Sequence, residues 1–276
     1  MKIARGELEV GRFRVPYRRY GEDDDVFLCV SGALQTMGAW APVAKRFCRD
    51  FTVVVFDMPG VGRSEILRGP PRVSVDEQLE VVDAIVADAQ VRGRLALAGS
   101  SWGTAIAAAW AARHPDAVDR LVLSSFGLSS NATLQAIVDR AEALYTARDY
   151  AGGGDLILEL IGARVSPAYK RQIVAQFSAL TDASAASFVE HCRNVLSLGR
   201  LQDEVDLTRI RARTLIVNGA DDVIIDPNDM WAAKALIPDC ECLMVEGVGH
   251  FLTFERPELL EDYAAFLLAP PQRAVG

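Results

Sequence analysis

The sequence predicts an α/β fold: a mainly parallel sheet of eight strands, flanked by helices on both faces. Two observations carry this prediction. Continuous apolar runs of strand length recur along the chain, as expected for strands that are buried on both faces. Stretches with helical periodicity separate these runs, and strand–helix alternation of this kind builds parallel sheets. The chain has 276 residues, 50% of them hydrophobic, and one large α/β domain can use its whole length.

The elements follow one another in a defined order. Residues 8–10 and 12–17 have the pattern of an opening antiparallel pair. The buried strands expected after them are residues 26–30, 51–56, 94–98, 119–125, 213–217 and 241–245. A capping box formed by Ser74 and Glu77 predicts a helix that runs through Gln90. The other helices expected around the sheet cover residues 40–49 and 104–110 and begin near residues 226–227 and 256–257.

The strand–helix alternation stops between residues 126 and 205. This stretch has mostly helical patterns, with breaks expected at the glycines 152–154 and at residues 166–167. Ligands of open α/β sheets bind at the carboxyl edge of the strands, so helices inserted here would cover a binding site. The alternative is a simple elaboration of the packing. We therefore expect two parts: a core made of residues 1–126 and 206–276, and a helical cap, or lid, made of residues 127–205 and inserted after the sixth strand.

Composition excludes several classes of function. The net charge is −8 and the pI is near 5.0, and no Lys/Arg cluster suits a nucleic-acid partner. No uncharged apolar stretch reaches about 20 residues, which argues against stable membrane insertion. The start of the chain lacks the apolar core of a secretory signal. The five cysteines are scattered, and Cys240 and Cys242 fit ordinary thiols better than zinc ligands. We expect a cytoplasmic protein without a metal or organic cofactor.

A G-x-S-x-G motif spans Gly99 to Gly103, between an apolar strand and a helix. The two glycines allow the sharp turn that holds a serine in a strained, exposed conformation at a strand end. Ser101 is therefore the candidate nucleophile. The alternative is a Gly/Ser loop without chemistry.

A serine hydroxyl needs a base, and the chain offers His114, His191 and His250. His114 ends the helix after Ser101, roughly 20 Å away at about 1.5 Å per residue, which is too far. His250 lies in the loop after the last predicted strand, at the same sheet edge as Ser101. We expect His250 to be the general base.

A carboxylate after the preceding strand should orient the imidazole and stabilise the imidazolium. Asp221 and Asp222 are adjacent there, and their side chains point opposite ways in an extended turn, so only one can face His250. The G-x-x-D spacing favours Asp222, with Asp221 as the alternative. A third carboxylate, Asp57, follows an earlier strand and is expected to hold its own turn by hydrogen bonds to the backbone.

The oxyanion formed on attack needs donors that are already aimed at it. We expect these to be the backbone N–H groups of Trp102, at the start of a helix, and Ala33, in the turn after the third strand. The alternative for the second is a plain tight turn. The candidates for substrate binding are Gly32, Leu34, His191 and Phe251. His191 lies in a helix expected at residues 185–198, where it either contacts a substrate hydroxyl or carboxylate or is a packing histidine.

With these positions assigned, the chain resembles the α/β-hydrolase superfamily from end to end, including the order Ser101, Asp222, His250. Within it, the chain resembles the 3-hydroxyacyl-thioester acyltransferases, the group of 3-(3-hydroxyalkanoyloxy)alkanoic acid synthases and 3-hydroxyacyl-ACP:CoA transacylases. The segments that carry this resemblance are 56–59, 100–103, 139–144, 191–198 and 245–252. The chain departs from the group at Thr104, where a second glycine is usual, at Ser31, where Asn is common, and at residues 223–225.

The resemblance implies an eight-stranded α/β-hydrolase fold. It also implies an acyl-Ser101 intermediate formed from an acyl ester or from an acyl thioester of ACP or CoA. The acceptor is water, a hydroxyl or a thiol. The alternatives are a carboxylesterase, a thioesterase or a carbon–carbon bond hydrolase of a small metabolite. A ligand receptor that kept the fold without catalysis is a further alternative. The sequence carries no signal of oligomeric state.

Overall fold

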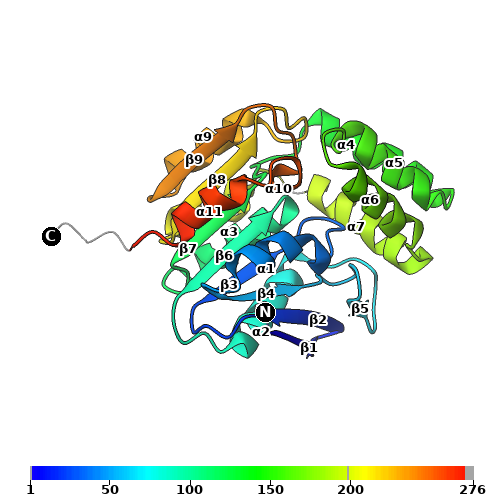
Figure 1. The fold of residues 1–276 in the computed structure, drawn as a ribbon. Helices are drawn as coiled ribbons and strands as arrows, with labels where there is room; N and C mark the ends of the chain where they lie inside the picture. Colours follow the sequence, from blue (N-terminus) through cyan, green and yellow to red (C-terminus); the bar gives the residue numbers. More distant parts are fainter. Residues whose placement is uncertain (1, 198, 271–276) are drawn as a thin grey trace.

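The computed structural model describes residues 2–197 and 199–270. Its sheet runs in the order β1-β2-β4-β3-β6-β7-β8-β9 (Figure 1). The strands are β1 (Ile3–Val10), β2 (Phe13–Tyr20), β3 (Val26–Val30), β4 (Thr52–Phe56), β6 (Leu95–Ser100), β7 (Arg120–Ser124), β8 (Arg213–Gly219) and β9 (Cys240–Val245). β2 is antiparallel to β1 and β4, and every pair from β4 to β9 is parallel. A ninth strand, β5 (Glu65–Ile66), pairs with β2 and was not predicted, because two residues carry no periodicity.

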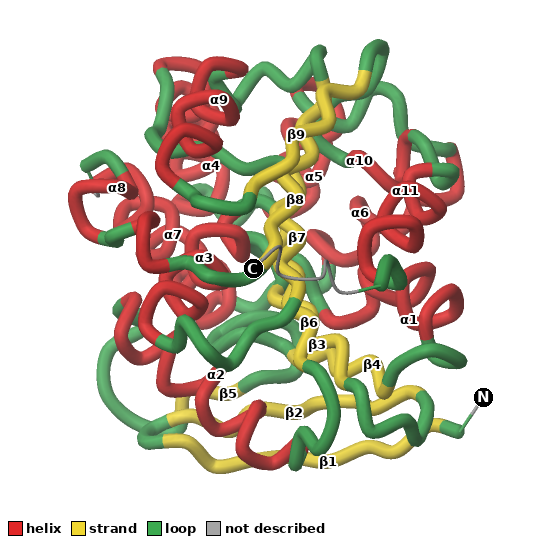
Figure 2. The backbone as a smooth tube through the Cα atoms, turned by 90° about the vertical axis from the view of Figure 1, so that its left-hand side faces the viewer, coloured by secondary structure: helices red, strands yellow, loops and turns green. Residues whose placement is uncertain are grey.

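Helices cover both faces of the sheet, as Figure 2 shows edge-on. α2 (Val75–Ala89), α3 (Trp102–Arg113) and α9 (Pro227–Leu236) pack on one apolar cluster of the sheet, and α1 (Ala41–Phe47) and α11 (Leu259–Leu267) on the other. The shorter pieces are the 3₁₀ helices Met37–Trp40 and Leu207–Arg209, α8 (Leu201–Glu204) and α10 (Leu252–Glu255). No helix in the described ranges is long and apolar enough to cross a membrane.

Four helices between β7 and β8 form a separate layer above the sheet, coloured green to yellow in Figure 1. They are α4 (Ala132–Thr146), α5 (Tyr150–Leu160), α6 (Pro167–Ser178) and α7 (Asp182–Ser197). Their apolar side chains form a cluster distinct from the two sheet clusters, and Leu34 and Phe251 join it from loops of the sheet. These four helices are called the helical insertion below.

The glycines 152–154 do not break the chain as predicted, because they lie inside α5. Asp149 caps this helix by accepting from the N–H of Gly152. A Cβ on Gly153 would lie 2.7 Å from the Tyr145 ring, and one on Gly154 would lie 3.1 Å from Phe177. These glycines therefore let three helices pack closely. α7 begins at Asp182, three residues earlier than predicted, and the predicted end at Leu198 lies outside the described residues.

Candidate active site

Ser101 occupies the sharp turn between β6 and α3. Its φ of 51° and ψ of −125° are strained for a residue other than glycine. The turn closes tightly: a Cβ on Gly99 would lie 2.4 Å from the carbonyl oxygen of Gly103, and one on Gly103 would lie 2.3 Å from that of Val30. The two glycines of the motif are therefore required by packing. Thr104 fits because its hydroxyl donates to the Ser101 carbonyl at 2.5 Å.

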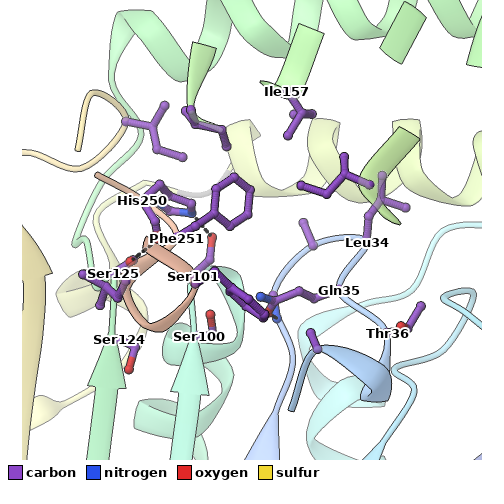
Figure 3. Close-up of a pocket in the computed structure, with 18 of the residues that line it drawn as sticks. Leu34, Gln35, Thr36, Ser100, Ser101, Ser124, Ser125, Ile157, His250 and Phe251 are labelled. Atoms are coloured by element: carbon purple, nitrogen blue, oxygen red, sulfur yellow. Dashed lines mark hydrogen bonds between the residues drawn. The ribbon is translucent and has the colours of Figure 1, made fainter. Parts of the chain in front are cut away.

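Ser101, His250 and Asp222 form one hydrogen-bonded chain, although they come from three separate loops. His250 Nε2 lies 3.0 Å from Ser101 Oγ, and His250 Nδ1 lies 2.7 Å from Asp222 Oδ2. Figure 3 shows Ser101 and His250 facing each other above the strand ends. The other carboxylate oxygen of Asp222 accepts from the N–H of Ile224 at 3.0 Å, which fixes its orientation. The side chains of His250 and Asp222 are buried, so solvent weakens their interaction little.

The other polar candidates lie apart from this chain of hydrogen bonds. Asp221 forms an ion pair with Arg164 at 2.7 Å. His114 stacks on Trp110 at the far end of α3. Asp57 accepts from two backbone N–H groups of neighbouring turns, the structural role that the sequence predicts.

A four-residue turn after β3 lies beside Ser101. Gln35 closes it, because its N–H donates to the Gly32 carbonyl and its Oε1 accepts from the Gly32 N–H. A Cβ on Gly32 would lie 2.8 Å from the Ser100 carbonyl oxygen, so glycine allows the close approach. Within the described part of the chain, the N–H groups of Ala33 and Trp102 have no hydrogen-bond acceptor. Both are therefore free to bind an oxygen next to Ser101.

Three polar residues around the site were missed by sequence reasoning. Glu255 in α10 accepts from the N–H of Gly249 at 2.7 Å and of Phe251 at 3.1 Å, so its carboxylate brackets His250. Ser125 donates to the His250 carbonyl at 2.8 Å. Gln78 in α2 accepts from the indole N–H of Trp102 at 2.8 Å. Of these three, only Glu255 had a local signal in the sequence, because it lies four residues after Phe251 and directly follows the loop that carries His250.

A cavity of about 190 Å³ opens above Ser101 and His250, between the sheet and the helical insertion. Its walls are mostly apolar and include Ile137, Val138, Ile157, Ile173, Phe177 and Phe251. Gly32, Ala33 and Leu34 also line the cavity, and Figure 3 shows Leu34, Ser101 and Phe251 among the residues around it. A second cavity of about 570 Å³ also touches Ser101 and runs along α3 past Ala105 and Ala109.

His191 from α7 reaches the edge of the site. Its ring meets the Trp102 ring edge to face, with centroids 5.1 Å apart. Burial lowers the pKa of His191 to about 4, so the imidazole is neutral at neutral pH. Its Nε2 is buried and has no partner among the described residues.

No group of metal-ligating side chains occurs in residues 2–197 and 199–270, and all five cysteines are free thiols. Cys240 and Cys242 lie on the outer strand β9, away from Ser101.

Comparison with known proteins gives a consistent result. A family model described as the alpha/beta hydrolase fold matches residues 25–150. The chain is 24% identical over 267 residues to the (R)-3-hydroxydecanoyl-ACP:CoA transacylase of Pseudomonas aeruginosa, covering 95% of this chain and 88% of that enzyme. It is 22% identical to the 2-hydroxy-6-oxo-6-(2'-aminophenyl)hexa-2,4-dienoic acid hydrolase of Metapseudomonas resinovorans, covering 91% and 86%.

Among solved structures, the enol-lactonase from Burkholderia xenovorans LB400 has a TM-score of 0.80 at 19% identity, covering 96% of this chain and 100% of that one. Likeness at this level concerns the fold. Together with the parallel sheet and the helices on both of its faces, these matches confirm the predicted fold class. The chain therefore has the α/β-hydrolase fold.

Proposed function

We propose that this enzyme transfers acyl groups from 3-hydroxyacyl thioesters, carried on ACP or CoA, through an acyl-Ser101 intermediate. The observation that carries the proposal is the hydrogen-bonded chain of Ser101, His250 and Asp222 at the floor of an apolar cavity. Relatives named as 3-hydroxydecanoyl transacylases over nearly the whole chain support the choice of substrate.

The first half of the reaction forms the acyl-enzyme. His250 Nε2 takes the proton of the Ser101 hydroxyl as its oxygen attacks the thioester carbonyl carbon. Asp222 holds the imidazole and stabilises its positive charge. The N–H groups of Ala33 and Trp102 bind the oxyanion. When the tetrahedral intermediate collapses, the carbon–sulfur bond breaks and His250 returns its proton to the thiolate.

The second half releases the acyl group. His250 takes a proton from the acceptor, which attacks the acyl-Ser101 carbonyl, and then gives it to Ser101 as the new bond replaces the ester. A thiol acceptor gives a new thioester, a hydroxyl gives an ester, and water gives the free acid. Atoms and charges balance in each case, and no cofactor takes part.

The helical insertion serves as the cap of this site in our proposal, and residues 1–126 and 206–276 as the core. The apolar walls that the insertion contributes suit an alkyl chain of medium length. Gly32, Leu34 and Phe251 border the cavity next to Ser101 and are proposed to contact the acyl group. Since ACP and CoA thioesters are made in the cytoplasm, a cytoplasmic location is part of the proposal.

Hydrolysis is the second candidate function. The relative from Metapseudomonas resinovorans is named as a hydrolase and matches 91% of this chain. Water can use the same base and the same oxyanion donors as a thiol, so the two functions differ only in the acceptor.

The test uses the purified protein and its Ser101→Ala variant with 3-hydroxydecanoyl-ACP, with and without free CoA. Mass spectrometry of the products is expected to find 3-hydroxydecanoyl-CoA with the wild type. The variant should lose roughly 10⁴- to 10⁶-fold in turnover. Free acid as the only product, independent of CoA, would replace the proposal by hydrolysis. Undiminished turnover by the Ser101→Ala variant would contradict the acyl-serine mechanism. If neither protein turns over the thioester, labelling of Ser101 by a fluorophosphonate would distinguish an enzyme with another substrate from an inactive receptor.

A further inference from the structure

The turn that carries Ala33 borders a small cavity of about 20 Å³. Residues 31–34 border it on one side, and Gln78, Trp102, Ser187 and His191 contribute to the rest of its wall. Ala33 and Trp102 also border the larger cavity that touches Ser101. The small cavity is therefore a direct neighbour of the proposed oxyanion site. We call it the side pocket.

Gln78 gives the side pocket an unpaired donor. Its side chain is buried, with only 3% of the residue exposed. Because an indole N–H can only donate, the contact with Trp102 fixes the amide oxygen on that side. The amide nitrogen faces elsewhere, is buried, and has no acceptor in the described ranges. Buried amide groups without a partner are rare in folded proteins.

His191 gives the side pocket a second unpaired polar atom. Its Nε2 is buried and has no partner within residues 2–197 and 199–270. The ring is held edge to face against Trp102, so it borders the same cavity as Gln78. A neutral imidazole nitrogen either accepts or donates, depending on the tautomer. Two residues that each carry an unpaired buried polar atom thus border one small space next to the proposed oxyanion donors.

We propose that the side pocket receives the 3-hydroxyl group of the acyl substrate, with Gln78 and His191 as its hydrogen-bond partners. This inference rests on the proposed function. A hydroxyl oxygen accepts from the Gln78 amide, and the hydroxyl pairs with His191 in either tautomer because it can both donate and accept. Two carbon–carbon bonds, about 2.5 Å end to end, separate the substrate carbonyl from the hydroxyl-bearing carbon. Ala33 and Trp102 border the side pocket as well as the larger cavity that touches Ser101, so a carbonyl held by their N–H groups lies next to the side pocket.

The competing interpretation is a structural water molecule, since a cavity of this size holds one. The two interpretations differ in what they predict for substrates. A structural water would matter equally for acyl chains with and without a 3-hydroxyl group. A hydroxyl site would discriminate between them, because a plain acyl chain leaves both protein groups unpaired.

The experiment measures kcat/KM for 3-hydroxydecanoyl-CoA and decanoyl-CoA in the wild type, His191→Phe and Gln78→Met. The wild type is expected to favour the hydroxylated substrate by about 100-fold or more. Each variant should reduce this ratio by about tenfold. A loss that comes only from the contacts with Trp102 affects both substrates and cancels in the ratio. His114→Phe is the matched control, since it replaces another histidine that packs on a tryptophan, and should keep the wild-type ratio.

Two results would overturn the assignment: a wild type that does not discriminate, or variants that slow both substrates equally, as a structural water predicts. Gln78→Met tests the assignment on a different helix should His191→Phe fail to fold. Both results differ from failure of the proposed function, in which neither thioester would be turned over by any form of the enzyme.

Discussion

Glu255 determines where the imidazole of His250 lies. Its two carboxylate oxygens accept from the N–H groups on either side of His250, at 2.7 and 3.1 Å. Ser125 holds the carbonyl of the same residue. Hydrogen bonds to an ionised carboxylate are stronger than neutral ones. The two hydrogen bonds to Glu255 therefore fix the loop that carries His250 without contacting the substrate. Glu255 is therefore a positioning residue in our proposal.

Replacing Glu255 by Gln should lower kcat about tenfold and leave KM within about twofold, because one of the two accepting oxygens becomes a donor. Steady-state kinetics on the acyl substrate measures both constants. Glu258→Gln is the control: it makes the same change in charge three residues later, at an exposed position whose side chain makes no cap hydrogen bond. Equal effects of the two variants, or a loss confined to KM, would contradict the positioning role.

The residues with local sequence signals could be predicted, and those without could not. Ser101 is marked by its flanking glycines, and Asp222 and His250 by their positions after successive strands. Gln78 and Gln176, which have no such signal, act through contacts with segments that are distant in sequence. Such contacts depend on how the helices pack against the sheet, and this arrangement cannot be predicted from residue spacing in a single sequence.

At the scale of elements, α6 of the helical insertion is tied directly to the turn that carries Ala33. Gln176 Nε2 donates to the carbonyl of Leu34 at 2.5 Å. Leu34 has a φ of 56°, a conformation that costs free energy for a side chain other than glycine, yet it is 93% buried against the insertion. The insertion thus holds the turn in a conformation that the turn alone would not favour.

Gln176→Leu should therefore lower kcat by about tenfold, because the Ala33 N–H loses its fixed direction toward the oxyanion. Gln172→Leu is the control, since Gln172 lies one turn earlier on α6 and borders the same cavity. Binding of a non-reacting acyl analogue to both variants should stay close to the wild type. A change in analogue affinity that matches the change in kcat would show that Gln176 only shapes the cavity.

The glycines of α5 show why the insertion was harder to predict than the sheet. Apolar runs identify buried strands directly, since such strands are enclosed by neighbours on both faces. The three glycines 152–154 have the composition of a helix break, but in the structure their lack of a side chain lets Tyr145 and Phe177 pack closely against α5. A glycine can mark either a turn or a close contact, and only the tertiary structure distinguishes the two.

At the scale of the whole molecule, the enzyme has two apolar clusters on the sheet and a third within the insertion. Leu34 and Phe251 join the third cluster from the sheet loops, and both line the cavity that contains Ser101. Packing between core and insertion therefore passes through the candidate site itself. The stability of the whole fold should then respond to changes at residues such as His191, which lies where the two parts meet.

This connection predicts how stability depends on pH. Burial holds the pKa of His191 near 4 in the folded protein, against about 6.5 for an exposed histidine. As pH falls below about 6.5, the unfolded chain therefore binds a proton that the folded protein excludes, and the free energy of unfolding decreases. At pH 5 this single group should lower it by about 2 kcal/mol relative to neutral pH.

Urea unfolding of the wild type and His191→Phe at pH 7.5, 6 and 5 measures this contribution. The difference between the two proteins at each pH isolates His191, because the other titrating groups are shared. The variant should lose less stability than the wild type between pH 7.5 and pH 5, since phenylalanine takes up no proton in either state. If the free energy of unfolding fell equally with pH in both proteins, the imidazole would take up its proton in the folded state. Water would then reach His191 where the helical insertion packs on Trp102.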